Sequence, residues 1–271
     1  MATSGHGSGE ARRLGLALRR HRIDRLVLFP DSLSSRITGF YSGARERIGH
    51  GPRGADLEAM IGLTRRVARR SRGERHLEEE YLDLARAAGV EALPPRPLAL
   101  EPAAVARAAE LLRHVSEPLI LAPGARYGPA KRWPASRFAQ VARAWPGSVV
   151  LVGGAEDAAD TAAVREILGE RALDLTGKTD LPTLAAVLAR ASAVVSNDSG
   201  AAHVAGALGR PTIVVFGSTD PRWTAPRGEH VRVLWDRVRC APCFRTHCPY
   251  EDAYACLRIV ESDRVSEALP R

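Results

Sequence analysis

The 271-residue sequence has no long apolar run: no window holds the roughly 18 consecutive apolar residues of a membrane-spanning helix. Its first residues, MATSGHGSGEARR, also lack the apolar segment of a secretory signal peptide, so cytoplasmic residence is expected. Lysine is almost absent, because only Lys131 and Lys178 occur, and the formal net charge of +8 therefore comes from arginine. Such a charge suits an anionic membrane surface, a nucleic acid or a phosphorylated substrate, although arginine is abundant along the whole chain.

Aromatic residues are also scarce, at 5% of the chain, and the densest arginine cluster, Thr64–Arg75, contains none. Single-stranded nucleic acids are commonly bound by stacking their bases on aromatic side chains. The cluster therefore argues against a nucleic-acid partner.

The four cysteines all fall near the end, at Cys240, Cys243, Cys248 and Cys256. In a reducing compartment such a cluster can bind a metal ion, with His247 as a further ligand. Zinc knuckles pair a Cys-x2-Cys with a matching second pair, and this chain has no second pair of that spacing. Zinc binding and a reduced, partly buried thiol cluster both stay open, and a basic zinc-bearing nucleic-acid binder is the corresponding functional alternative.

Short apolar runs alternate with helical periodicity through the second half of the chain. We expect strands at 118–122, 148–152, 172–175, 193–196, 212–216 and 230–234. We expect helices at 103–115, 136–144, 156–168, 181–190, 201–208 and 263–269. This alternation is typical of a parallel, doubly wound α/β sheet.

The first half shows fewer strands. The pattern predicts strands at 25–29 and 47–49, and helices at 32–41, 57–70 and 77–88. The proline-rich segment 92–102 is typical of a linker, so we expect two domains, 1–100 and 101–271.

Polar clusters follow four of the expected strands of the second half, at 123–134, 153–156, 176–178 and 197–203. In an open parallel sheet, ligands bind beyond the carboxyl ends of the strands. In the last cluster Asp198, Ser199, Gly200 and His203 lie at an expected helix N-terminus, which favours a phosphate group. Capping of the helix by Asp198 or Ser199 is the structural alternative.

The first cluster contains Gly124 and Gly128, which permit a tight loop, and Lys131, whose ammonium suits a diphosphate. A solvated loop lysine is the alternative for Lys131. Glu156 is ambiguous, because a first-turn acid of a helix and a ribose ligand look alike in the sequence. These features indicate a phosphate-bearing ligand on a doubly wound domain.

Four motifs stand in register along the second half of the chain: LAPGARYGPAKRWP, LVGGAED, DLTGKTDLPTLAAVLARASAVVSNDSGAAHVAGALGRPTIVVFGSTDP and CAPCFRTHCPYEDAYACL. Together they resemble the bacterial lipopolysaccharide heptosyltransferases of glycosyltransferase family nine, most of all the type II enzymes that use ADP-heptose. A weaker resemblance covers 23–57. The resemblance as a whole implies the GT-B fold of two Rossmann-like domains, an acceptor-side domain at 1–100 and a nucleotide-sugar domain at 101–271.

The resemblance also implies an inverting glycosyltransferase that moves heptose from ADP-heptose to a lipid-linked core oligosaccharide at the inner membrane surface. It uses no metal and no cofactor, which agrees with the absence of an Asp-x-Asp motif. The basic segment 65–75, interpreted as a helix, would face the anionic acceptor or the membrane. The residues that it assigns to substrate binding are Tyr127, Lys131, Glu156, Gly177, Asp198, Ser199, Gly200 and His203.

By position, Lys131 would contact the diphosphate with Tyr127 in the same loop, and Glu156 would face the ribose. Residues 177–181 would border the adenine. Asp198 would hold heptose hydroxyls, and the helix N-terminus that follows it, including Ser199, Gly200 and His203, would bind the diphosphate. Lys131 and the helix dipole would stabilise the departing ADP in place of a metal ion.

One part of the family pattern has no counterpart in this sequence. Family members begin with a strand and a Gly-Asp turn whose aspartate deprotonates the acceptor, and the matching region here begins only at the strand 25–29. We therefore expect an incomplete first domain, with the catalytic base unassigned and Asp31 as a stand-in. A cap of the helix 32–41 is the alternative role for Asp31. A catalytically impaired, nucleotide-binding remnant of the family is the alternative function.

Overall fold

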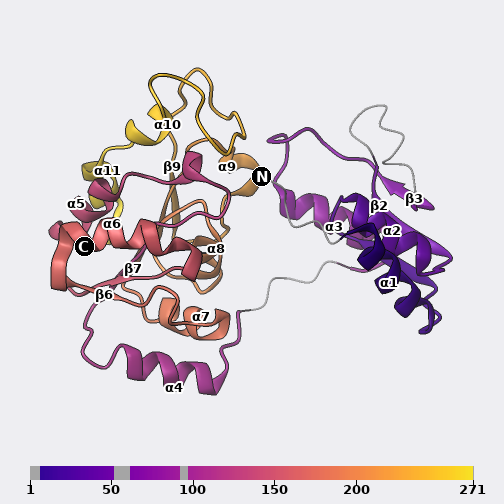
Figure 1. The fold of residues 1–271 in the computed structure, drawn as a ribbon, viewed down its shortest axis with the longest axis horizontal. Helices are drawn as coiled ribbons and strands as arrows, with labels where there is room; N and C mark the ends of the chain where they lie inside the picture. Colours follow the sequence, from indigo (N-terminus) through magenta and orange to yellow (C-terminus); the bar gives the residue numbers. More distant parts are fainter. Residues whose placement is uncertain (1–6, 52–61, 92–96, 271) are drawn as a thin grey trace. The chain divides into compact units, whose positions relative to one another are not determined.

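A computed structural model describes residues 7–51, 62–91 and 97–270 of the protein. The chain divides into two compact units, residues 1–95 and 96–271 (Figure 1). The boundary falls inside the proline-rich segment that the sequence analysis interpreted as a linker.

The second unit is built on a six-stranded sheet in which every neighbouring pair is parallel, in the order β6-β5-β4-β7-β8-β9. The strands are β4 Leu119–Ala122, β5 Val149–Leu151, β6 Ala172–Asp174, β7 Ala193–Asn197, β8 Thr212–Val215 and β9 Val231–Leu234. All six expected strands of this half are present, and the order is that of dinucleotide-binding Rossmann domains. The strand order reverses between β4 and β7, which are hydrogen-bonded neighbours.

Helices cover both faces of this sheet. They are α4 Pro102–Leu111, α5 Ala135–Ala144, α6 Ala158–Leu168, α7 Leu181–Ala189, α8 Gly200–Ala207, α9 Pro221–Thr224, α10 Ala255–Arg258 and α11 Ser262–Ala268. One core packs α5, α6 and α11 on the sheet, and a second core packs α4, α7 and α8 (Figure 1). Three short 3-10 turns complete the unit: η2 Pro129–Lys131, η3 Ala155–Asp157 and η4 Gly169–Arg171.

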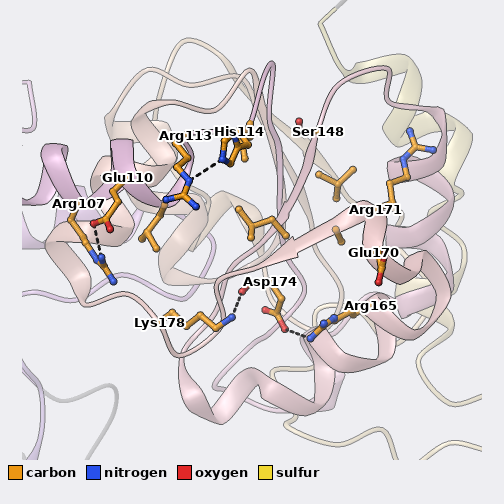
Figure 2. A pocket seen from close by; sticks show the side chains of 15 residues that line it. Arg107, Glu110, Arg113, His114, Ser148, Arg165, Glu170, Arg171, Asp174 and Lys178 are labelled. Carbon is orange, nitrogen blue, oxygen red and sulfur yellow. Dashed lines mark hydrogen bonds and ion pairs between the residues drawn. The ribbon is translucent and has the colours of Figure 1, made fainter.

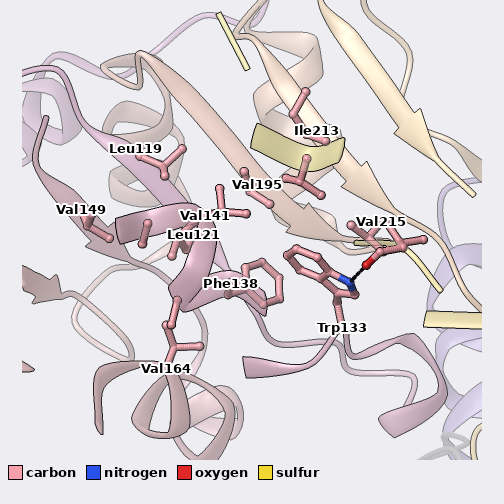
Figure 3. Close-up of a cluster of buried hydrophobic side chains, with 14 of the residues drawn as sticks. Leu119, Leu121, Trp133, Phe138, Val141, Val149, Val164, Val195, Ile213 and Val215 are labelled. Carbon is pink, nitrogen blue, oxygen red and sulfur yellow. Dashed lines mark hydrogen bonds between the residues drawn. The ribbon is translucent and has the colours of Figure 1, made fainter. Parts of the chain in front are cut away.

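Trp133 anchors the loop after β4 in the first of these cores (Figure 3). Its ring lies 5.0 Å from that of Phe138 in an edge-to-face contact, and its indole N–H donates to the carbonyl of Val260 at 2.9 Å. A buried tryptophan whose N–H is satisfied fixes the loop at little cost in unpaired polar groups.

The first unit holds a three-stranded parallel sheet in the order β1-β2-β3. Its elements are α1 Ser8–Arg19, β1 Arg25–Leu28, α2 Leu33–Tyr41, β2 Glu46–His50, β3 Arg65–Val67 and α3 Leu77–Ala87. The helix α1, which the sequence analysis missed, packs closely on α2, because a Cβ at Gly15 would lie 2.6 Å from the carbonyl of Thr38. The Thr38 hydroxyl donates to the carbonyl of Ala11 at 3.1 Å.

The expected helix at 57–70 is wrong where it can be compared. Residues 57–61 lie outside the described ranges, and the remainder contains β3, whose Arg65 and Val67 pair with Ile48 and His50 of β2. The ladder with β2 satisfies the backbone groups that a helix would have paired internally. The basic segment 65–75 is therefore no helix either, and its first residues belong to a strand.

Candidate functional site

Lys131 and Asp198 meet at the point where the strand order of the second unit reverses. Lys131 ends the loop that follows β4, and Asp198 directly follows β7. The ammonium nitrogen lies 2.5 Å from Oδ2 of Asp198, and the two side chains are 14% and 4% exposed. Two residues 67 positions apart are thus brought together at the place where doubly wound sheets bind ligands.

Thr219 completes this contact from a third loop, the one after β8. Its hydroxyl donates to the same Asp198 oxygen at 2.7 Å. The sequence analysis missed Thr219, although a polar Ser-Thr-Asp run directly after an apolar strand was a usable signal. The carboxylate of Asp198 is therefore oriented by the ammonium of Lys131 and the hydroxyl of Thr219. These two groups come from the loops after β4 and β8, the strands on either side of β7.

Tyr127 lies in the same loop as Lys131. The ammonium nitrogen of Lys131 sits 5.0 Å from the centre of the Tyr127 ring, a distance at which the ring face attracts a cation. The Tyr127 hydroxyl donates to the carbonyl of Phe244 at 2.5 Å. The ring of Tyr127 thus positions the ammonium of Lys131, and its hydroxyl is bound by the segment that carries the cysteines.

Asn197, which is fully buried, holds both ends of this loop. Its side-chain N–H2 donates to the carbonyl of Pro123 at 2.6 Å, and its side-chain oxygen accepts from the backbone N–H of Trp133 at 2.9 Å. The sequence analysis gave Asn197 no role. Its contacts fix the loop that carries Lys131 relative to β7, and hence relative to Asp198.

The N-terminus of α8 is open to a ligand. Ser199 occupies the cap position but its side chain makes no capping hydrogen bond, and its hydroxyl instead lies 2.9 Å from that of Ser196. The capping alternative is therefore wrong for Ser199, while the carboxylate of Asp198 is used by Lys131 and Thr219. A Cβ at Gly200 would have nothing within 4 Å, so this helix end has room for an anionic group.

His203 lies on the first turn of the same helix. Its side chain is exposed, and its backbone N–H donates to the carbonyl of Ser199 at 3.4 Å. The structure thus places Asp198, Ser199, Gly200 and His203 on one helix end beside Lys131.

The loops after β5 and β6 lie against each other and beside the loop of Lys131. The Gly177 N–H donates to the carbonyl of Gly153 at 3.0 Å, and the φ angle of Gly177 is 67°, which favours glycine. A Cβ at Gly124 would lie 2.1 Å from a carboxylate oxygen of Asp157. Glu156 lies in η3, within the loop after β5, and is exposed.

Asp31 lies at the carboxyl end of β1 in the first unit. Its carboxylate accepts from the guanidinium groups of Arg36 and Arg69, and Arg69 also donates to Glu80 at 3.2 Å. The cap of α2 is Ser32, whose side chain accepts from the backbone of the third residue along the chain. The capping alternative for Asp31 is therefore wrong, and the residue belongs to an ion-pair network.

His50 lies next to this network and gives the first unit a pH dependence. It is 3% exposed, and its pKa is lowered by burial and, to a smaller extent, by Arg69.

As the pH falls below 6.5, the ordinary pKa of histidine, His50 binds a proton in the unfolded chain but stays neutral in the folded chain. We expect the free energy of unfolding to fall by up to about 1.4 kcal/mol per pH unit from this point down to the folded pKa. Urea titrations across this range will measure the slope. His50→Gln should remove it, the exposed His21→Gln should keep it, and an unchanged slope in His50→Gln would contradict the assignment.

A surface hollow of about 730 Å³ lies away from Lys131 and Asp198, beside the edge strand β6 (Figure 2). Its charged groups engage one another or the backbone: Arg107 pairs with Glu110 at 2.7 Å, and the ammonium of Lys178 donates to the carbonyl of Asp174 at 2.7 Å. Of the residues expected to bind substrate, only Lys178, from the segment 177–181 expected to border the adenine, lines it. The sheet edge with Lys131 and Asp198 therefore remains the candidate site.

Among residues 7–51, 62–91 and 97–270, no three side chains of His, Cys, Asp or Glu are grouped so as to hold a metal ion. In the same part of the chain no helix is long and apolar enough to cross a membrane.

The fold and the site define the class. A parallel sheet in the Rossmann order, with a lysine and an open helix N-terminus at the reversal point, is typical of nucleotide-binding α/β proteins. Residues 11–254 match the family model described as glycosyltransferase family 9 (heptosyltransferase). The chain belongs to this family, as the resemblance predicted.

Curated relatives agree. The chain is 33% identical over 254 residues to lipopolysaccharide heptosyltransferase 2 of Escherichia coli strain K12, covering 85% of this chain and 71% of the relative. It is 34% identical over 250 residues to lipopolysaccharide heptosyltransferase 2 of Salmonella typhimurium, with the same shares covered. The chain is thus a glycosyltransferase of the heptosyltransferase type.

Solved structures confirm the fold. The structure of E. coli ADP-heptose lps heptosyltransferase II matches with a TM-score of 0.74 and 30% identity, over 96% of this chain and 80% of that chain. A glycosyl transferase family 9 structure from Veillonella parvula matches with a TM-score of 0.77 at 20% identity, over 98% and 79%. The expected α/β fold with parallel sheets, as in GT-B heptosyltransferases, is therefore confirmed.

Proposed function

We propose that this protein is an inverting glycosyltransferase that moves heptose from ADP-heptose to the inner core of lipopolysaccharide. One observation carries the proposal: in a family 9 chain, the half-buried Lys131 meets Asp198 beside the open N-terminus of α8. The relatives named above are lipopolysaccharide heptosyltransferases, and one related structure is described as E. coli heptosyltransferase WaaC with ADP. These names support the donor and the acceptor class.

In the proposed donor complex, the diphosphate lies between Lys131 and the N-terminus of α8. Backbone N–H groups near Ser199 and Gly200 and the side chain of His203 bind its oxygens, and the helix dipole favours its charge. Asp198 then turns from Lys131 to the hydroxyls of the heptose, since the diphosphate replaces it as the partner of the ammonium. The ring of Tyr127 keeps the ammonium of Lys131 in this position.

The nucleoside lies over the neighbouring loops in this proposal. Glu156 accepts hydrogen bonds from the ribose, and Gly177 with residues 178–181 borders the adenine. The contacts among the loops after β4, β5 and β6 support this: the Gly177 N–H donates to the carbonyl of Gly153 at 3.0 Å, and Gly124 lies against Asp157.

Transfer proceeds by direct displacement. The acceptor hydroxyl oxygen forms a bond to the anomeric carbon as the bond from that carbon to the β-phosphate oxygen breaks, and the bonding electrons leave with ADP. Lys131 and the helix N-terminus neutralise the charge that develops on the departing diphosphate. The configuration at the anomeric carbon is inverted, and the proton of the acceptor hydroxyl passes to a base.

Asp31 as that base stays a prediction. Its carboxylate already accepts from Arg36 and Arg69, so few of its lone pairs are free for a hydroxyl proton. We therefore expect Asp31→Asn to act mainly on folding, lowering the free energy of unfolding by about 1–3 kcal/mol because two charged hydrogen bonds are weakened. ADP binding should not change, because the donor site lies in the second unit.

Denaturant titration and calorimetry with ADP will measure these two effects, with the exposed Asp24→Asn as the control. Unchanged stability together with a loss of transfer of about 100- to 10,000-fold would instead assign the base to Asp31.

Thermal unfolding with added nucleotides tests the donor half of the proposal. A ligand that binds only the folded state stabilises it by RT ln(1 + [L]/Kd), about 2.7 kcal/mol at 100 times Kd. ADP should raise the melting temperature of the second unit in a concentration-dependent way, and UDP or GDP should raise it less. Equal shifts with all three nucleotides would contradict the adenine assignment.

A further inference from the structure

All four cysteines of the chain line one surface hollow of about 560 Å³. They are free thiols; Cys256 is buried, whereas Cys240, Cys243 and Cys248 are half-buried. Ala130 and Ser218 line the same hollow, so it adjoins the loop that carries Lys131. Neither the family match nor the proposed donor site assigns a role to these four cysteines.

The four thiols differ in chemistry. Backbone hydrogen bonds from Tyr254 and Tyr250 lower the pKa of Cys248, and Arg245 and Arg258 lower it further. Burial raises the pKa of Cys256 to about 11, and the neighbouring thiols add to this rise. Reactive cysteines are those that are partly exposed and stabilised as thiolates, whereas buried cysteines with raised pKa are slow to react.

The segment that carries these cysteines also holds the donor loop. The backbone N–H of Ala130 donates to the carbonyl of Thr246 at 3.1 Å, and the N–H of Phe244 donates to the carbonyl of Ser218 at 2.8 Å. The hydroxyl of Tyr127 donates to the carbonyl of Phe244 at 2.5 Å. Phe244 and Thr246, which make these contacts, lie between Cys243 and Cys248 in the chain. A covalent change at either cysteine therefore acts directly on the loop of Lys131.

We propose that Cys248 is an oxidation site: hydroperoxides convert it, with one neighbouring cysteine of the hollow, to a disulfide. The Cys248 thiolate attacks the O–O bond, giving a sulfenic acid and the alkoxide, which leaves as the alcohol. The neighbouring thiol then displaces the hydroxyl as water and forms the S–S bond. Two thiols lose two electrons and two protons, and one hydroperoxide is reduced to an alcohol and water.

Three neighbouring thiols around one hollow provide the resolving partner that such sites need. A metal ion held by the same four thiols is the competing outcome, and in the described ranges no three ligand side chains are grouped for one. Slower transfer after oxidation is also expected, and that consequence alone rests on the proposed function.

Alkylation of the full chain with limiting iodoacetamide at neutral pH, followed by peptide mass spectrometry, tests the thiol order. Cys248 should be alkylated first, and prior alkylation of any other cysteine would overturn the proposal. Hydrogen peroxide should then remove two free thiols per chain from the unmodified protein, and a thiol reductant should restore both.

Cys248→Ser should lose no thiol pair at the same peroxide dose, while its melting temperature and its stabilisation by ADP stay unchanged. The double variant Arg245→Gln, Arg258→Gln should lose the pair more slowly than the parent chain. If Cys248→Ser loses thiols at the parent rate, or if the purified protein retains one metal ion per chain that blocks alkylation, the proposal fails. Because thiols are counted without any transferase assay, a failed heptosyltransferase assignment is distinguished from a failed thiol assignment.

Discussion

Replacing Lys131 by alanine is expected to lower the rate of transfer by about 100- to 1,000-fold, the usual cost of removing one preorganised donor from a developing anion. ADP binding should weaken as well, because the ammonium lies at the centre of the proposed diphosphate site. The residue is only 14% exposed in its side chain and is held by Asp198 and Tyr127, so little reorganisation is needed to meet the diphosphate. Steady-state kinetics with ADP-heptose and calorimetry with ADP measure the two losses.

Arg107→Ala is the matched control, because it removes one positive charge of the second unit at a residue with no role in the candidate site. Its guanidinium pairs with Glu110 at 2.7 Å and is 53% exposed. This variant should keep transfer and ADP affinity within a few-fold of the parent. Equal losses in both variants would indicate a general effect of positive charge rather than a site at Lys131.

The second large effect is expected from Asp198→Asn, with opposite results for binding and transfer. In the free protein Asp198 forms an ion pair with the ammonium of Lys131, and its negative charge repels the negative charge of an incoming diphosphate. Removing that charge should leave ADP affinity unchanged or raise it. Transfer should fall by about 10- to 100-fold, because a charge-assisted hydrogen bond to a heptose hydroxyl, worth about 1.5–3 kcal/mol, is lost.

Calorimetry with ADP and kinetics with ADP-heptose distinguish these effects. Asp236→Asn is the control, since that carboxylate pairs with Arg264 at the surface. Loss of ADP affinity in Asp198→Asn would contradict the assignment of Asp198 to the sugar and would assign it to positioning Lys131.

The second unit was predictable from the sequence because its strands are short buried runs bounded by polar loops. The residues of β4, β7 and β8 are all buried, so composition and length alone identify them. The parallel order then brings Lys131 and Asp198 to the carboxyl ends of neighbouring strands, where they form an ion pair.

The sequence did not predict the parts that tertiary contacts determine. Leu63 and Val67 are four residues apart and suggest a helix, but pairing of Arg65 and Val67 with β2 makes this segment a strand. In α1 the informative signal was two small residues, Ala11 and Gly15, which allow the close approach to α2.

Asn197 and Thr219 were missed for a similar reason. A buried asparagine at the end of a strand has no distinctive pattern in one sequence, and the polar run that contains Thr219 does not show which partner the threonine takes. Their roles follow from partners far along the chain, the ends of the loop 123–133 and the carboxylate of Asp198.

The most direct test of the account is transfer itself. The protein is incubated with ADP-heptose and an inner-core lipid acceptor that lacks the heptose, and ADP release is measured together with the mass and the anomeric configuration of the lipid product. We predict that ADP appears in step with a product heavier by one heptose, whose anomeric configuration is opposite to that of the donor. Stabilisation by ADP with no lipid product would contradict the account and identify the protein as a nucleotide-binding remnant of the family.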